Sequence, residues 1–197
     1  MRERAMCYRL LAAMDQHAAA QAIEAFLRAL GRDPQREPEL SGTGARVAQA
    51  YAEDLLEGYR VDVDALLSSN VFAGRTELVV VRDIPVVTTC PHHLVQSTGT
   101  AVIAFAPEEH LVGIGTVART VDAFARRLAL QEQIGERVVA ALQKHLAPRW
   151  SACRLTLSHV CMVARGGRTA GAYVETVALA GGDVDEAVVY SALGIGR

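Results

Sequence analysis

The sequence lacks any long uninterrupted run of apolar residues. None of its apolar stretches approaches the roughly 20 residues that a helix needs to cross a bilayer. Near the start of the chain, residues 10–13 are apolar, but this stretch is too short for the core of a secretion signal. We therefore expect a cytoplasmic protein that has no membrane partner.

The chain also has little excess charge of either sign. It contains 20 Lys and Arg against 22 Asp and Glu, a formal net charge of −2, with a pI of about 6.3. Proteins that bind nucleic acid carry a basic footprint, which this composition does not provide. We expect no nucleic-acid partner, and any phosphate site must be built from a local group of side chains.

The chain has only four cysteines, Cys7, Cys90, Cys153 and Cys161. In a reducing compartment a few thiols are better explained as core residues or metal ligands than as a disulfide framework. No internal repeat is present, and residues 182–197 form a Gly-rich, small-residue tail that we expect to be mobile. With 197 residues, 51% of them hydrophobic, the chain fits one globular functional unit.

The first 60 residues have helical patterns. Apolar residues recur at helical spacing over residues 14–30, and Gly31 is placed to end that helix in the left-handed conformation. Residues 33–43 contain Pro and Gly and indicate a surface connection. A second helix is predicted over residues 45–56. We treat residues 1–60 as an N-terminal helical region.

Strand patterns begin near residue 77. Residues 78–81 and 84–89 are rich in β-branched side chains and are interrupted by Asp83, which predicts a bent or bulged strand. After a polar tract, residues 100–105 predict a second strand. Together they suggest an antiparallel pair.

Helices and two more strands complete the pattern. Residues 116–146 fit two amphipathic helices with a break near residues 128–131. Strands are predicted over residues 153–164 and 172–180. The order strand, strand, helix, helix, strand, strand predicts an α+β domain over residues 61–181, with an antiparallel sheet and two helices on one face.

The segment from Thr88 to His93 carries the densest chemistry. Cys90 and His93 lie three positions apart at the end of a predicted strand, with His92 between them. This spacing can bind one zinc ion. A lone Cys-x-x-His is a weak signal, and the alternative is a buried thiol beside surface histidines.

A second segment, residues 158–161, strengthens the metal interpretation. In a strand the period of two places His159 and Cys161 on one face, while Val160 points into the core. A second pair of ligand candidates is thus presented side by side.

These five side chains compete for three positions on a metal. A catalytic zinc site has three protein ligands and an open position for water, whereas a structural site is usually closed by four. We assign Cys90, His93 and Cys161 to zinc, which leaves His92 and His159 to move protons. Two thiolates offset much of the charge of the ion, so a nearby base would help the bound water to react.

Four separated segments in one order give the sequence a resemblance to the GTP cyclohydrolase I enzymes of bacteria and animals. It extends over about residues 42–181. Several matches in one order are far more specific than any single motif. The segments are Cys90-Pro91-His92-His93-Leu94, Val112-Gly113-Ile114 with Ala118-Arg119, residues 126–132 (RRLALQE) and residues 159–166 (HVCMVARG).

The resemblance implies a fold and an assembly. Members of this family have the tunnelling fold, in which antiparallel strand pairs flank two helices. Their subunits associate through the sheets into a barrel, usually a homodecamer of two stacked rings of five. It further implies an active site shared between subunits.

The resemblance also implies a reaction. It is zinc-dependent hydrolytic opening of the guanine imidazole ring of GTP at C8, with release of formate, leading to 7,8-dihydroneopterin triphosphate in pterin and tetrahydrofolate biosynthesis and one-carbon metabolism. Position by position, Cys90, His93 and Cys161 match the zinc ligands. His92 and His159 match the proton-transfer histidines.

Substrate-binding residues follow from the same resemblance. Glu132 matches the carboxylate that accepts from the guanine ring N–H and the exocyclic amine, with Gln131 as its helper. Arg119 and Arg165 match ligands of the triphosphate, and Arg46 resembles a third one near a helix start.

Each of these assignments has a structural alternative that involves no ligand. Gln131 and Glu132 would be the solvated face of a helix, and Arg119 would pair with Asp122 on the same helix, a contact of little energetic weight.

Three departures from the family pattern motivate alternatives. Pro91 replaces a usual Glu, Gly115 and Thr116 replace a usual Ser-Lys, and the tail lacks the usual charged helix. The alternatives are a paralogue that acts on another guanine derivative (a less phosphorylated nucleotide, nucleoside or base) and a non-catalytic zinc-stabilised scaffold. A nitrile reductase of the same fold ranks last, because its nucleophile pattern is not seen.

Overall fold

The computed structural model describes residues 14–182 and 184–196, which form two compact units that meet in sequence between Arg60 and Val61. Cys7 lies outside the described residues. Within the described part of the chain, no helix combines the length and the apolar character needed to cross a membrane.

Two helices dominate the N-terminal unit, as predicted. Helix α2 (Gln16–Ala29) begins after Asp15, whose side chain accepts a hydrogen bond from the backbone of Ala18, and Gly31 follows with a φ of +79°. Helix α3 (Thr43–Ala50) packs against α2. The shorter elements are η1 (Pro38–Leu40), the π-helical η2 (Tyr51–Leu55) and η3 (Glu57–Arg60).

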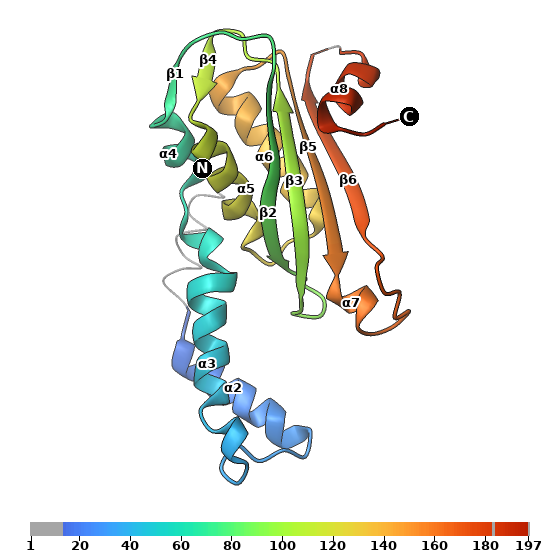
Figure 1. Ribbon diagram of the computed structural model, residues 1–197. Coiled ribbons are helices and arrows are strands. Elements are labelled where there is room, and N and C mark those ends of the chain that lie inside the picture. Colours follow the sequence, from blue (N-terminus) through green and yellow to red (C-terminus); the bar gives the residue numbers. More distant parts are fainter. Residues whose placement is uncertain (1–13, 183, 197) are drawn as a thin grey trace. The chain divides into compact units, whose positions relative to one another are not determined.

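The C-terminal unit is built on a four-stranded antiparallel sheet with two helices on one face, which confirms the predicted architecture (Figure 1). The strand order is β2-β3-β5-β6, so each strand pair of the sequence remains adjacent in the sheet. The elements are β2 (Val79–Thr89), β3 (Gln96–Phe105), α5 (Ile114–Ala125), α6 (Gln131–Leu146), β5 (Trp150–His159) and β6 (Val174–Gly181).

The main core lies between this sheet and helices α5 and α6. Alternate residues of each central strand face the helices, because side chains of a strand point to opposite faces in turn. Cys153 lies in this core, and burial raises the pKa of its thiol to about 12, so it is a protonated core thiol. Fully buried members include Ile103, Phe105, Val121, Ile134, Leu142, Leu155 and Leu157.

The opposite face of the sheet carries a helix where the sequence predicted a mobile tail. Helix α8 (Glu186–Leu193) packs Val189 and Leu193 against Trp150 and its neighbours on β3 and β5. Arg82 and Arg154 donate hydrogen bonds to carbonyls at its C-terminal end. The run Glu186–Leu193 is apolar at most positions, which hides the helical period in the sequence.

Two strand ends next to the predicted site differ from the prediction. The polar tract that begins at Gln96 belongs to β3. The predicted strand over residues 153–164 is too long, because β5 ends at His159 and the helical turn α7 (Val160–Val163) follows. The last residue of β5 that pairs with β3 is His159, opposite Ser97, and the last that pairs with β6 is Leu157, opposite Val174, so residue 160 pairs with neither strand. The backbone therefore makes its hydrogen bonds in a helical turn.

The bulge predicted at Asp83 is confirmed. The pairing register of β2 with β3 shifts between Val81 and Ile84, and Asp83 has a φ of +54°. The sequence prediction missed three short elements that lie before β2 and after β3. They are α4 (Val63–Ser68), β1 (Val71–Ala73) and β4 (His110–Val112).

Candidate metal centre and its pocket

A tight turn between β2 and β3 carries Cys90 and His93. The backbone N–H of Leu94 donates to the Cys90 carbonyl at 2.9 Å, and the Cys90 N–H donates to the carbonyl of Val95 at 3.0 Å. Pro91 supplies the fixed φ that suits the second position of such a turn. Leu94 adopts a left-handed φ of +53°, a costly conformation that recurs at functional sites.

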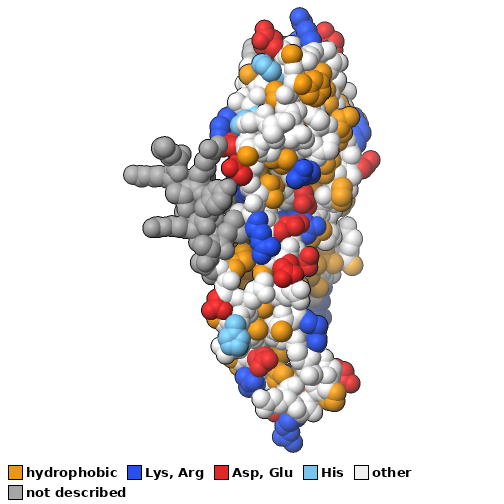
Figure 2. Space-filling model, turned by 90° about the vertical axis from the view of Figure 1, so that its left-hand side faces the viewer, with side chains coloured by type: hydrophobic (Ala, Val, Ile, Leu, Met, Phe, Trp, Pro, Cys, Tyr) orange, Lys and Arg blue, Asp and Glu red, His pale blue; other side chains and the backbone are white. Residues whose placement is uncertain are grey.

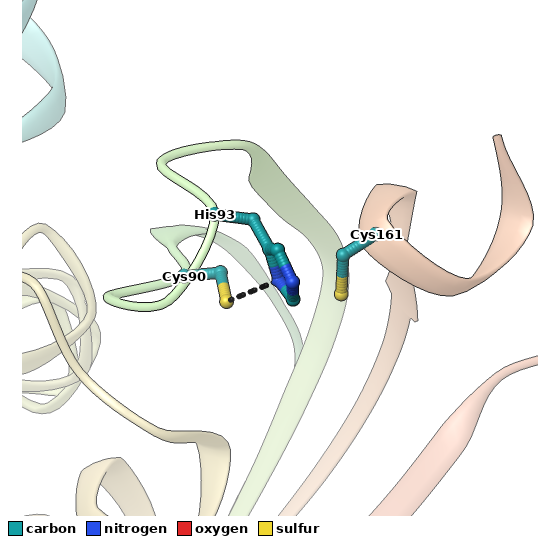
Figure 3. Close-up of side chains that lie close together, drawn as sticks. All are labelled: Cys90, His93 and Cys161. Carbon is teal, nitrogen blue, oxygen red and sulfur yellow. Dashed lines mark hydrogen bonds between the residues drawn. The ribbon is translucent and has the colours of Figure 1, made fainter. Parts of the chain in front are cut away.

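Cys161 reaches the same place from α7. Because the chain turns into a helix after His159, the prediction that His159 and Cys161 share a strand face is wrong. Val160 is 41% exposed, so it does not point into the core. The helical turn instead directs the Cys161 thiol toward the turn that carries Cys90 and His93 (Figure 3).

The three side chains converge as the ligands of one metal ion would. Their ligand atoms all lie within 4.8 Å of one another, and Cys90 Sγ is 3.8 Å from His93 Nδ1. A tetrahedral ion with zinc-like bond lengths needs ligand atoms roughly 3.5–3.8 Å apart, so only small side-chain movements are required. Among the residues that the structure describes, Cys90, His93 and Cys161 are the one such group that could hold a metal.

A pocket of about 280 Å³ opens beside this group. Its walls come from the ends of β2, β3 and β5, from the start of α6 and from α7, so segments far apart in sequence meet there. The lining includes all three ligand candidates together with Thr88, His92, Ser97, Gln131, Glu132 and His159.

His159 is held at both ring nitrogens. Its Nδ1 lies 3.0 Å from Ser97 Oγ, and its Nε2 lies 2.7 Å from Gln131 Oε1. The ring is half-buried at the end of β5. Its orientation is therefore determined by one neighbour on β3 and one on α6.

The side chain of Gln131 is bonded within the protein at both ends of its amide. It is 3% exposed, and its amide Nε2 donates to the carbonyls of Leu155 and Val174 and to Thr176 Oγ1, at 3.0–3.1 Å. Carbonyls only accept, so the amide nitrogen must face them and Oε1 must accept from the Nε2–H of His159. The amide thus joins α6 to β5, β6 and His159.

His92 and Glu132 have exposed side chains that line the pocket. The ring of His92 makes an edge contact with His93, with centroids 6.3 Å apart. Glu132 follows Gln131 at the first turn of α6, where the helix dipole favours a carboxylate. Both groups are placed to meet a ligand in the pocket.

The three arginines are not among the residues that line this pocket. Arg119 on α5 and Arg165 after α7 are exposed, and Arg46 belongs to the N-terminal unit, where it donates to Thr43 Oγ1 at 3.0 Å. Asp122, the alternative partner of Arg119, forms an ion pair with Arg126 at 2.9 Å. Figure 2 shows acidic and basic side chains interspersed over one face, in keeping with the small net charge.

Sequence reasoning gave no role to Thr88 or Ser97. Thr88 lies two residues before Cys90, and Ser97 lies in the polar tract before the predicted second strand. The register that pairs Thr88 with Ser97, and Ser97 with His159, is a property of the folded sheet. The available signal was the hydroxyl of Thr88, which in a strand would share a face with Cys90 because the two residues are two positions apart.

Known proteins are similar in sequence to this chain over most of its length. The model of the family described as GTP cyclohydrolase I matches residues 19–191. GTP cyclohydrolase 1 of Synechococcus sp. (strain JA-2-3B'a(2-13)) is 37% identical over 161 residues, which are 81% of this chain and 69% of that protein. GTP cyclohydrolase 1 of Mycobacterium ulcerans (strain Agy99) is 38% identical over 171 residues, 86% of this chain and 84% of that protein. The protein of that name from Allorhizobium ampelinum is 38% identical over 165 residues, 83% of this chain and 81% of that protein. This chain belongs to the GTP cyclohydrolase I family.

Proposed function

We propose that this protein opens the guanine imidazole ring of GTP at C8 by hydrolysis, releases formate and leads to 7,8-dihydroneopterin triphosphate. The observation that carries the proposal is the convergence of Cys90, His93 and Cys161 at a pocket that Glu132 and His159 also line. Family membership supports a guanine nucleotide as the substrate. Residues 61–181 would form the catalytic domain.

We propose zinc as the metal. Two soft thiolates and one imidazole suit zinc better than magnesium or calcium, which prefer oxygen ligands. A zinc ion held by these side chains would act as a Lewis acid that polarises water and the substrate ring. The fit rests on the separations of the three ligand atoms, all within 4.8 Å.

The remaining pocket residues supply binding and proton transfer. The Glu132 carboxylate would accept hydrogen bonds from the guanine ring N–H and the exocyclic amine. His92, exposed in the pocket, and His159, held by Ser97 and Gln131, would move protons during ring opening. Gln131 would act by orienting His159, because both ends of its amide are already bonded within the protein.

The decisive experiment is a substrate panel with formate detection. Purified protein supplied with zinc should release formate from GTP and form a product that becomes fluorescent after oxidation. Bound zinc without formate from GTP would reject the proposed reaction.

A second candidate is the opening of another guanine derivative. Gly115 and Thr116 stand where the family usually has Ser-Lys. Thr116 is uncharged and 6% exposed, and Gly115 has no side chain, so neither replaces the lysine as a cation for phosphate. Losing a charged hydrogen bond would weaken triphosphate binding by about 1.5–3 kcal/mol. The same panel with GMP, guanosine and guanine separates the two candidates, since a clear preference for GTP contradicts the second.

We also propose a homo-oligomer in the cytoplasm, a homodecamer as the family resemblance implies. Strands β2 and β6 are the sheet edges, and Val177 and Leu179 on β6 are 40% and 45% exposed, which supports association through the sheets. Arg46, Arg119 and Arg165 would then meet the triphosphate at a site shared between subunits. A monomer mass by light scattering would contradict this assembly.

Substituting the proton-transfer histidines should separate an enzyme from a scaffold. His92→Ala and His159→Ala should each reduce kcat for formate release by about 10²–10⁴-fold, the usual contribution of a general acid or base. Metal content and the circular dichroism spectrum should stay unchanged. His110→Ala, which changes the exposed first residue of β4, is the matched control and should retain activity. Full activity in both His92→Ala and His159→Ala would remove their assigned role.

A further inference from the structure

Three polar side chains lie directly opposite one another across the sheet where it borders the pocket. Thr88 pairs in register with Ser97, and Ser97 pairs with His159. Residues paired in this way point to the same face, with Cβ atoms roughly 4.5–5.5 Å apart. Gln131 on α6 extends the series through its bond to His159. We call Thr88, Ser97, His159 and Gln131 the polar row.

The hydrogen bonds of the polar row have a direction. Gln131 Oε1 accepts from His159 Nε2–H, because its amide nitrogen is occupied by carbonyls. In the neutral ring Nδ1 then carries the lone pair, so Ser97 must donate its hydroxyl hydrogen to it across 3.0 Å. The oxygen of Ser97 keeps the capacity to accept another hydrogen bond. It can take that bond only from a donor group.

Thr88 is the open end of the polar row. It is 3% exposed, and Oγ1 has no hydrogen-bond partner among the described residues, although Thr88 lines the pocket. Buried polar side chains almost always have a partner, because an unpaired buried hydroxyl costs about 1–3 kcal/mol. The neighbouring Thr89 Oγ1 is also buried without a described partner, but Thr89 does not line the pocket. The pocket therefore holds a hydroxyl that is unsatisfied until a ligand enters.

We propose that Thr88 Oγ1 and Ser97 Oγ form a subsite that binds one N–H or O–H donor group of the substrate. The group donates to Ser97, whose own hydrogen is used by His159, and it also bonds to Thr88, whose hydroxyl can accept or donate. The donor group is thereby placed one hydroxyl away from His159. Ser97 has two roles, as a binding residue and as a positioning residue for His159. This inference rests on the proposed function, because it takes the ligand to be a guanine nucleotide.

Two nearly isosteric variants test the subsite. Thr88→Val and Thr89→Val each remove a buried hydroxyl without a described partner, one in the pocket and one outside it. The probe is 7-deaza-GTP, a GTP analogue without the imidazole ring, titrated calorimetrically into the zinc-loaded full chain. Thr88→Val should raise Kd by about three- to tenfold, the value of one hydrogen bond, while Thr89→Val should stay within about twofold of the wild type.

The unfolding stability of the two valine variants shows whether each hydroxyl serves ligand binding or supports the fold. Removing a hydroxyl that has no partner is nearly neutral or stabilising, so neither valine variant should lower the urea midpoint of unfolding. Equal Kd values for Thr88→Val and Thr89→Val would overturn the proposal. So would a lower urea midpoint for Thr88→Val alone, since it would show that the hydroxyl supports the fold.

Ser97→Ala gives a second, independent readout. It should raise Kd as Thr88→Val does and also lower kcat for formate release, because His159 loses one of its two ring partners. Since both hydroxyls hold one ligand group, the double variant should raise Kd by less than the product of the single effects. If the two substitutions raise Kd by factors that simply multiply, Thr88 and Ser97 make unrelated contacts, and the shared subsite is overturned. A wild type that releases no formate but keeps this Kd pattern would reject the proposed function alone.

Discussion

Replacing Cys161 with alanine should remove the bound metal and, with it, the release of formate. The variant keeps Cys90 and His93, which lie in one short turn, but loses the proposed ligand that α7 brings from a distant part of the chain. Loss of an outer partner of a metal ligand already costs about 10–100-fold in affinity, so loss of a ligand should cost more than about a hundredfold. Metal analysis after dialysis, with formate release at limiting zinc, measures both effects.

Cys153→Ala is the matched control for this experiment. It also removes one thiol from the chain, but Cys153 lies in the core with a pKa of about 12 and is not a pocket residue. It should bind metal as the wild type does and lose only the stability of a buried sulfur. Equal zinc stoichiometry in Cys161→Ala and Cys153→Ala would mean that the metal is held elsewhere.

The parts of the site that depend on local sequence could be predicted. Cys90 and His93 are three residues apart, so any tight turn after the strand brings their side chains together. The order of strands and helices along the chain followed from hydrophobic periodicity, which the core residues of β3, β5, α5 and α6 explain. These features need no knowledge of the rest of the fold.

Other parts depend on where strands end and how they pair. The geometry assumed for Cys161 was wrong because β5 and its pairing with β3 end at His159, and one sequence does not give that endpoint. The partners of Gln131 could not be predicted, because its carbonyl acceptors on β5 and β6 are 24 and 43 residues away. The polar row was missed because it exists only in the register of three strands. Helix α8 was missed because its apolar sequence shows little periodicity.

The largest expected loss of stability comes from a glycine of β3 whose missing side chain would point at the backbone of β5. A Cβ on Gly99 would lie 2.0 Å from the carbonyl oxygen of Thr156 and 3.0 Å from the Cα of Leu157. Both are backbone atoms, so a side chain cannot swing away and the two strands must separate. Gly99→Ala should therefore lower the free energy of unfolding by about 3 kcal/mol or more, as severe overpacking does.

Gly115→Ala is the control, because its new Cβ would meet no heavy atom within 4 Å. Its free energy of unfolding should stay within about 1 kcal/mol of the wild type, since alanine favours a helix. Urea denaturation of both variants measures the difference, and similar values would show that β3 and β5 tolerate a side chain between them. Because Ser97 and His159 pair two residues from Gly99 and its partner Leu157, strand separation should also weaken their hydrogen bond. Gly99→Ala should thus lose formate release beyond what its unfolded fraction explains, which ties the close approach of two strands to the chemistry of the pocket.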